Sequence, residues 1–134
     1  MKVLFLCTGN SCRSQMAEAF ARHYGGTAIE VASAGTAPVA VNPFAIEVMA
    51  ERDMDLSHYR SKSLQEIEMV PDVVITLCGD PDEACAAYPE KTQRIHWPLR
   101  DPAGAQGSRG DVLKVFRKVR DEIEVRVKDF LGPL

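Results

Sequence analysis

The sequence has little net charge and no long apolar run, and both absences restrict its function. With 16 basic and 19 acidic residues, the 134-residue chain has a formal net charge of −3, which gives no reason to expect a nucleic acid or an acidic membrane as partner. No apolar stretch approaches the roughly 20 residues of a membrane span, and the apolar start of the chain is too short for a signal peptide. Repeats, linkers and low-complexity segments are also lacking. We therefore expect a cytoplasmic protein with a single domain over residues 1–134, and a monomer is the default for such an architecture.

Cysteine pairs with metal-binding spacing are missing as well. The four cysteines are Cys7, Cys12, Cys78 and Cys85, and no two of them are separated by the two residues typical of structural zinc sites. The three histidines show no ligand spacing either, so we predict no metal site. Cysteines of cytosolic proteins are thiols by default, and a disulfide there is usually transient and catalytic.

Hydrophobic patterning predicts an α/β fold. Continuous apolar runs at residues 3–6 and 73–77 are typical of strands covered on both faces. Residues 28–33 alternate as in a strand near a sheet edge, and residues 94–97 are expected to form a fourth strand. Periodicity and capping signals predict helices from near Arg13 to Gly25, from Pro43 to about Arg52, at Ser63–Glu66, and from near Asp111 to Gly132, with a loop over residues 98–110. This alternation predicts a four-stranded parallel sheet with helices on both faces.

The segment between the first strand and the first helix carries the main chemical signal. It has the pattern Cys-x5-Arg-Ser, from Cys7 to Ser14. Gly9 and Asn10 tolerate positive φ, as a loop with inward-pointing N–H groups requires. Such a loop and the positive end of the helix bind a tetrahedral oxyanion and favour the thiolate form of Cys7, which Ser14 can hydrogen-bond. The predicted oxyanion-binding residues are Thr8, Gly9, Asn10, Ser11, Cys12, Arg13 and Ser14.

Other reactive residues are expected on the same side of the sheet. Ligands of parallel sheets bind beyond the carboxyl ends of the strands, which brings Cys7, Cys78 and the segment 97–101 to one rim. Asp101 can act there as a general acid, although an aspartate before a proline is also a common turn residue.

Cys78 and Cys85 either exchange a disulfide or are two buried structural thiols. An N-cap aspartate, a proline and an acidic first turn predict a helix over residues 80–85. Seven helical residues separate two Cα atoms by roughly 10 Å, whereas a disulfide tolerates no more than about 7 Å. A direct bond between the two therefore requires this helix to loosen.

These motifs resemble a known family. The loop from Cys7 to Ser14 resembles that of the low-molecular-weight protein tyrosine phosphatases, which have a flavodoxin-like fold. Cys78, Cys85 and residues 96–103 resemble the thioredoxin-coupled arsenate reductases built on that fold. The resemblance implies arsenate as substrate, with phosphate or sulfate as mimics, and no bound cofactor, because reduced thioredoxin supplies the electrons.

The resemblance also implies a relay of three cysteines that detoxifies arsenic. Cys7 attacks arsenate held by the loop and Arg13, and Asp101 protonates the departing hydroxide. Cys78 then attacks Cys7 and arsenite leaves. Finally, Cys85 attacks Cys78, and thioredoxin reduces the resulting labile disulfide.

Two other functions remain open. A phosphatase hydrolysing phosphomonoesters would use the same thiolate and acid, but phosphatases of this fold typically have a tyrosine after the Asp-Pro pair, where this chain has Ala103. A non-catalytic oxyanion or redox sensor would be favoured by the loss of Arg13 or Asp101, and both are present.

Some reductases of this family bind potassium beside the loop, at residues that match Asn10, Glu18 and Ser33. They also use a carboxylate where this chain has Lys62. An ammonium group at that place repels a cation and neutralises the same carboxylate. We therefore predict weak or no dependence on potassium.

Overall fold

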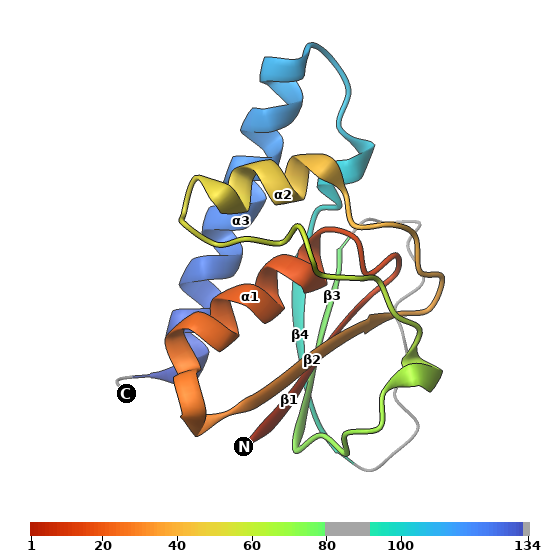
Figure 1. Cartoon of the computed structure of the whole chain (residues 1–134), viewed down its shortest axis with the longest axis vertical. Helices are drawn as coiled ribbons and strands as arrows, with labels where there is room; N and C mark the ends of the chain where they lie inside the picture. Colours follow the sequence, from red (N-terminus) through yellow and green to blue (C-terminus); the bar gives the residue numbers. More distant parts are fainter. Residues whose placement is uncertain (80–91, 133–134) are drawn as a thin grey trace.

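The protein folds around a four-stranded parallel sheet, as the patterning predicts. The computed structural model describes residues 1–79 and 92–132, and its strand order is β2-β1-β3-β4 (Figure 1). The strands are β1 (Lys2–Cys7), β2 (Glu30–Gly35), β3 (Val73–Cys78) and β4 (Gln93–Leu99). The α-helices are α1 (Arg13–Gly25), α2 (Pro43–Ala50) and α3 (Arg109–Leu131), and the short 3-10 helices are η1 (Gly26–Ala28), η2 (Leu64–Glu66) and η3 (Pro102–Gly104).

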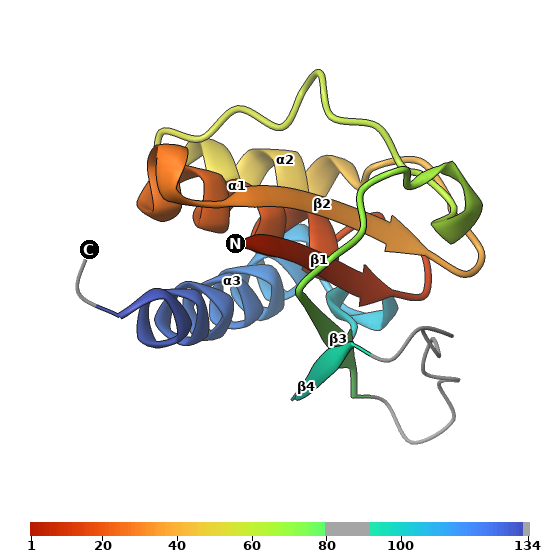
Figure 2. The ribbon, with the colours of Figure 1, turned by 90° about the horizontal axis from the view of Figure 1, so that it is seen from below.

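The two central strands are buried on both faces because their apolar runs are continuous. Val3 and Phe5 of β1 belong to the larger core, to which α1, α2 and α3 all contribute. Leu4 and Leu6 point the other way and belong to a smaller core. That core is closed by η2 and the segment after it, on the opposite side of the sheet from α1 and α3 (Figure 2).

The capping residues begin the helices where the sequence predicts. The side chain of Asn42 accepts a hydrogen bond from the N–H of Phe44, and Pro43 occupies the first turn of α2. Both halves of the capping box at the start of η2 are formed. Helix α3 begins two residues earlier than predicted because Ser108 is its N-cap and forms a capping box with Asp111.

The segment predicted as a loop after β4 is partly ordered. Strand β4 continues through Pro98 to Leu99, and a proline is tolerated there because β4 is an edge strand. The residues after Asp101 then form η3. The helix predicted over residues 80–85, which includes Cys85, lies outside the described residues.

The strand order has a direct consequence for ligand binding. The chain leaves β1 for β2 on one side and later returns to β3 on the other, so the order reverses between β1 and β3. Such a reversal opens a crevice beyond the carboxyl ends of the two strands. Within residues 1–79 and 92–132, no helix has the length and apolar character needed to cross a membrane.

Candidate active site

A pocket of about 220 Å³ lies at the crevice between β1 and β3. Its floor is the loop that follows β1, and its walls come from the segment after β2 and from η3. The lining residues are Cys7, Thr8, Gly9, Ser11, Cys12, Arg13, Ala37, Val39, Asp101 and Ala103. The structure thus brings together the predicted nucleophile, the predicted arginine and the predicted acid, although Arg13 and Asp101 are separated by 88 positions in the chain.

Cys7 is a buried free thiol at the end of β1, 3% exposed. The Oγ atom of Ser14 lies 2.8 Å from its sulfur, as predicted, and the backbone N–H of Asn10 donates to the same sulfur at 3.3 Å. Donors directed at sulfur stabilise a thiolate more than a thiol, because hydrogen bonds to a charged acceptor are the stronger ones. The thiolate is the nucleophilic form of cysteine.

The backbone of the loop agrees with the sequence at one position and differs at another. Asn10 has a φ of 48°, as predicted. Gly9 is not among the residues with positive φ, so this part of the expectation is wrong. A side chain at Gly9 would instead come within 3.2 Å of the Val39 side chain, so the absence of a Cβ keeps the loop and its neighbour close together.

Arg13 is the first residue of α1 and is 2% exposed. Its Nη1 atom donates to the backbone oxygens of Leu77 and Leu99, at 3.2 and 3.0 Å, at the ends of β3 and β4. These two bonds fix the plane of the guanidinium at the wall of the pocket. Cys12, the N-cap residue of α1, makes no capping hydrogen bond with its side chain, and the positive end of the helix is directed to the loop.

Asp101 lies at the mouth of the pocket, with its side chain 36% exposed. Its Oδ2 atom is 3.7 Å from Nη2 of Arg13, and its Oδ1 atom accepts a hydrogen bond from the N–H of Ala103. The turn function and the site function are therefore not alternatives: one carboxylate oxygen caps η3 and the other faces the arginine.

Cys12 is buried beside the pocket and hydrogen-bonded to Ser11. Burial raises the pKa of its thiol to about 12. Cys12 therefore remains a neutral thiol at physiological pH and is a poor nucleophile.

Cys78 ends β3 opposite Leu99 of β4 and is 4% exposed. Leu6 pairs with Thr76, so the ends of β1 and β3 carry Cys7 and Cys78 on neighbouring strands, as the sequence predicts. Cys78 is disulfide-bonded, whereas Cys7 and Cys12 are free thiols. Cys85 lies outside the described residues.

Several residues that support the loop were not predicted from the sequence. The buried side chain of Gln15 donates to both the backbone oxygen and Oδ1 of Asn10, and Ser61 donates to the same backbone oxygen. A Cβ at Gly35 would lie 2.5 Å from the backbone oxygen of Thr8, so only glycine allows β2 to pass this close behind the loop. The sequence does contain a signal for this contact, because Gly35 is the last residue of β2 and pairs with Cys7 at the end of β1.

The segment 37–42 also supports the loop from the outside. The N–H groups of Ala37, Val39 and Asn42 donate to the backbone oxygens of residues 8, 9 and 11, at 2.9 to 3.0 Å. Residues 37–40 of this segment are exposed, and Ala37 and Val39 line one side of the pocket.

The residues expected to match a potassium site, Asn10, Glu18 and Ser33, do not fit a potassium ion here. Oδ1 of Asn10 already accepts from the backbone N–H of Lys62 and from Gln15. Ser33 donates to Glu18, and the ammonium of Lys62 lies 4.0 Å from the same Glu18 oxygen. The side-chain oxygens of Asn10, Ser33 and Glu18 thus already accept hydrogen bonds from protein donors. The ammonium of Lys62 already supplies a positive charge beside them. In the part of the chain that the structure describes, no group of three or more His, Cys, Asp or Glu residues could hold a metal ion.

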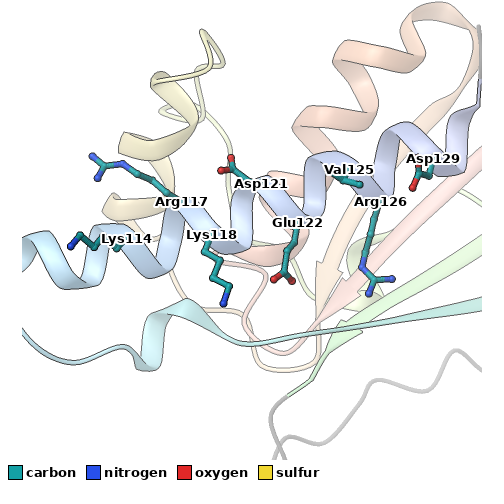
Figure 3. Close-up of a pocket in the computed structure, with 8 residues that line it drawn as sticks. All are labelled: Lys114, Arg117, Lys118, Asp121, Glu122, Val125, Arg126 and Asp129. Atoms are coloured by element: carbon teal, nitrogen blue, oxygen red, sulfur yellow. The ribbon is translucent and has the colours of Figure 1, made fainter.

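A larger hollow, of about 850 Å³, lies on the outer face of α3 (Figure 3). All its lining residues come from this one helix, and Lys118, Glu122 and Arg126 project from the same side with mixed charge. None of the predicted functional residues lines this hollow. We therefore place the active site at the loop that follows β1.

Comparisons with known proteins give matches over nearly the whole chain. Residues 2–134 match the family model described as low molecular weight phosphotyrosine protein phosphatase. An arsenate reductase of Halalkalibacterium halodurans is 46% identical over 129 residues, which cover 96% of this chain and 93% of that protein. A solved arsenate reductase in a phosphate-binding state superposes with a TM-score of 0.81 at 38% identity, covering 97% of this chain and 95% of the other.

A second solved structure is similar over nearly the whole of this chain. It is a thioredoxin-dependent arsenate reductase of Corynebacterium glutamicum, with a TM-score of 0.71 and 31% identity, covering 96% of this chain and 59% of the other. The family model and the full-length relative both extend over nearly all of the sequence. The chain therefore belongs to the low-molecular-weight phosphotyrosine protein phosphatase family.

Proposed function

We propose that this protein is an arsenate reductase, which reduces arsenate to arsenite with Cys7 as nucleophile and thioredoxin as electron donor. One observation carries the proposal: Cys7 is a free thiol at the floor of the loop pocket, while Cys78 on the neighbouring strand is disulfide-bonded. The nucleophile thus has a second cysteine at the end of the neighbouring strand, as a thiol–disulfide relay requires. Similarity to arsenate reductases, one of them thioredoxin-dependent, supports it.

Substrate binding uses the loop, the helix end and Arg13. The backbone N–H groups of residues 8–14 and the positive end of α1 attract the arsenate oxygens. The Arg13 guanidinium, held in one plane by the carbonyls of Leu77 and Leu99, can donate to two oxygens at once. Phosphate and sulfate have the same shape and are expected to bind as mimics.

The first chemical step forms a sulfur–arsenic bond. The Cys7 thiolate attacks arsenic, and a hydroxide leaves with the proton that Asp101 supplies, which makes it water. Ser14 and the N–H of Asn10 hold the thiolate in position before the attack. Arsenic is still in the +5 state after this step.

The redox step breaks the sulfur–arsenic bond. The Cys78 thiolate attacks the sulfur of Cys7, and the bonding electron pair goes to arsenic, which leaves as arsenite in the +3 state. A Cys7–Cys78 disulfide remains. Attack of the Cys85 thiolate on Cys78 releases the Cys7 thiolate and leaves a Cys78–Cys85 disulfide, which the dithiol of thioredoxin reduces while becoming a disulfide itself.

The remaining expectations fit this chemistry. No bound cofactor is needed, because a protein dithiol provides both electrons. A relay of thiols works in a reducing compartment, which supports a cytoplasmic location. The family model covers residues 2–134, which supports one domain over the chain. A monomeric state stays a prediction.

Hydrolysis of phosphomonoesters is the less favoured function. Among residues 1–79 and 92–132, the side chains of Ala37, Val39 and Ala103 line the pocket outside the loop, and they give no aromatic surface against which a phosphotyrosine ring could stack. The same thiolate and acid can still hydrolyse a small phosphate ester slowly.

A coupled assay tests the relay. NADPH oxidation is followed with thioredoxin, thioredoxin reductase and arsenate, and Cys7→Ser, Cys78→Ser and Cys85→Ser are each expected to abolish turnover. Cys12→Ser is the matched cysteine control and is expected to retain most of it, because Cys12 stays protonated. Full turnover in Cys85→Ser, or NADPH oxidation without arsenate, would contradict the relay. Hydrolysis of para-nitrophenyl phosphate by the same variants measures the phosphatase function.

A further inference from the structure

We propose that Gly79 is a positioning residue for the oxyanion site, because its lack of a side chain sets where Arg13 and Asp101 lie. Gly79 directly follows Cys78 at the end of β3 and is not among the residues that line the pocket. The inference rests on the proposed roles of Arg13 and Asp101 in arsenate reduction. Its main test measures phosphate binding, and therefore does not depend on turnover.

The backbone of β4 passes too close to Gly79 to leave room for a side chain. A Cβ at this position would lie 2.4 Å from the nitrogen, 2.8 Å from the carbonyl carbon and 2.6 Å from the oxygen of Leu99. A Cβ essentially never makes contacts below 3.0 Å. All three atoms belong to the main chain, so no rotation of a side chain can relieve the clash. Gly79 is not among the glycines with positive φ, so it is the close approach that requires a glycine here.

A β-bulge brings Leu99 to this place. Between Thr76 and Cys78 the register of β4 against β3 shifts by one residue, so that Cys78 pairs with Leu99 instead of Pro98. Such an extra residue bends the strand that carries it and can redirect a group next to an active site. A proline is tolerated at a bulge because the regular ladder of hydrogen bonds is interrupted there. The bulge and the glycine together therefore press the end of β4 against the end of β3.

The carbonyl of Leu99 is one of the two that hold the guanidinium of Arg13. Nη1 of Arg13 donates to it at 3.0 Å and to the carbonyl of Leu77 at 3.2 Å. Leu77 belongs to β3 and Leu99 to β4, so one nitrogen reaches both oxygens only while the two strand ends stay close together. Arg13 is 2% and Leu99 1% exposed, so water is not at hand to replace a bond that is lost. The contact at Gly79 thus fixes the plane in which the guanidinium meets an oxyanion.

Asp101 depends on the same contact because it follows Leu99 by two residues. Pro102, the next residue, is buried, and Oδ1 of Asp101 accepts from the N–H of Ala103, so the carboxylate is tied to the start of η3. Its Oδ2 atom lies 3.7 Å from Nη2 of Arg13. A displacement of Leu99 is therefore expected to move both the group that binds the anion and the acid that protonates its leaving oxygen.

The test is a double-mutant cycle on phosphate binding, measured by calorimetry. The full-length protein is used with Cys78 in its disulfide and Cys7 as a free thiol, as in the structure, and mass spectrometry verifies this state for each variant. Gly79→Ala is expected to raise the Kd for phosphate about tenfold, because a shift of about 1 Å in a positioned group is enough for an effect of this size. In an Arg13→Lys background the same substitution is expected to change Kd by less than about twofold, since two changes that act through one group are not additive.

Gly104→Ala is the matched control, because a Cβ there meets nothing within 4 Å although Gly104 lies in η3 beside the pocket. Its Kd is expected to match that of wild type. Pro98→Gly loosens the bulge without adding an atom and is expected to raise Kd about threefold when Arg13 is present and not when lysine replaces it. This variant keeps the proposal testable if Gly79→Ala does not fold.

A Gly79→Ala protein that binds phosphate within about twofold of wild type would overturn the proposal. So would an equal loss of affinity in both backgrounds, which indicates a general loosening of the site and not an effect through Arg13. In the coupled assay, kcat for arsenate is expected to fall at least about tenfold in Gly79→Ala because Asp101 is displaced as well, and an unchanged kcat would overturn that part of the proposal. A wild-type protein that fails to reduce arsenate while the binding cycle behaves as expected would reject the proposed function alone.

Discussion

Replacing Arg13 by lysine separates its structural contribution from its positive charge. Nη1 of Arg13 bridges the backbone oxygens of Leu77 and Leu99 and so joins the ends of β3 and β4. A lysine keeps the charge, but its shorter side chain does not bring the ammonium to the position of Nη1, and it has no second nitrogen to offer the anion. Arg13→Lys is therefore expected to weaken both the sheet end and the binding of anions.

The magnitude follows from the bonds that are lost. One hydrogen bond from a charged donor is worth about 1.5–3 kcal/mol, so we expect the free energy of unfolding to fall by about 2 kcal/mol. For a domain of this size, 1 kcal/mol corresponds to a Tm change of about 4 °C, so Tm falls by about 8 °C. Phosphate at 100 times its Kd stabilises wild type by about 2.7 kcal/mol. A tenfold weaker site would gain about half of that at the same concentration.

Thermal unfolding of the reduced protein, followed by circular dichroism with and without phosphate, measures both effects. The exposed ion pair of Arg109 with Glu47 provides the control, because Arg109→Lys is far from the pocket and a surface pair contributes at most about 1 kcal/mol. An Arg13→Lys protein that melts within 1 °C of wild type and keeps the whole phosphate shift would refute the bridging role of the guanidinium.

Three shorter predictions concern other parts of the site and the helix pair. Gly35→Ala places a Cβ 2.5 Å from the backbone oxygen of Thr8, so we expect the loop to shift and phosphate binding, measured by calorimetry, to weaken at least tenfold; unchanged binding would mean that the close approach is dispensable. Asp101→Asn removes the general acid, and kcat for arsenate in the coupled assay is expected to fall by a factor of about 10² or more, while the hydrogen bond to Ala103 can be kept by the amide oxygen. The carboxyl of Glu51 has its pKa lowered to about 2, first of all by hydrogen bonds from Arg117. Its contribution to stability is therefore present above its ordinary value near pH 4.5 and is lost as the pH falls toward 2. Because the pair is partly exposed, Glu51→Gln should cost only about 1 kcal/mol at pH 7 in urea unfolding, and the difference from wild type should shrink at pH 3; a constant difference would contradict the linkage.

The sheet and its helices could be predicted because their signals are local. A continuous apolar run is enough to identify β1 and β3, and the Asn42-Pro43 pair identifies the start of α2. The active-site loop was recognisable for a similar reason, since Cys7 and Arg13 are held by one short segment and its spacing is fixed by a strand end and a helix start.

The supporting residues were harder to predict because their contacts join distant segments. Gln15 looks like an ordinary polar helix residue, and only the fold shows that it is buried against Asn10. Gly9 was expected to need positive φ, but the fold uses its lack of a side chain to bring Val39 close. Backbone conformation and close approach both favour glycine, and a sequence does not distinguish between them.

The backbone bonds between the segment 37–42 and the loop also bear on how substrate preference can change. Three main-chain donors hold this rim, and Pro38, which has no N–H to give, lies between two of them. Side-chain substitutions at positions 37 and 39, which line the pocket, can therefore alter the shape of the entrance while the oxyanion cradle beneath stays intact. Directed evolution toward bulkier esters would have its safest starting point there, with proline avoided at positions 37 and 39.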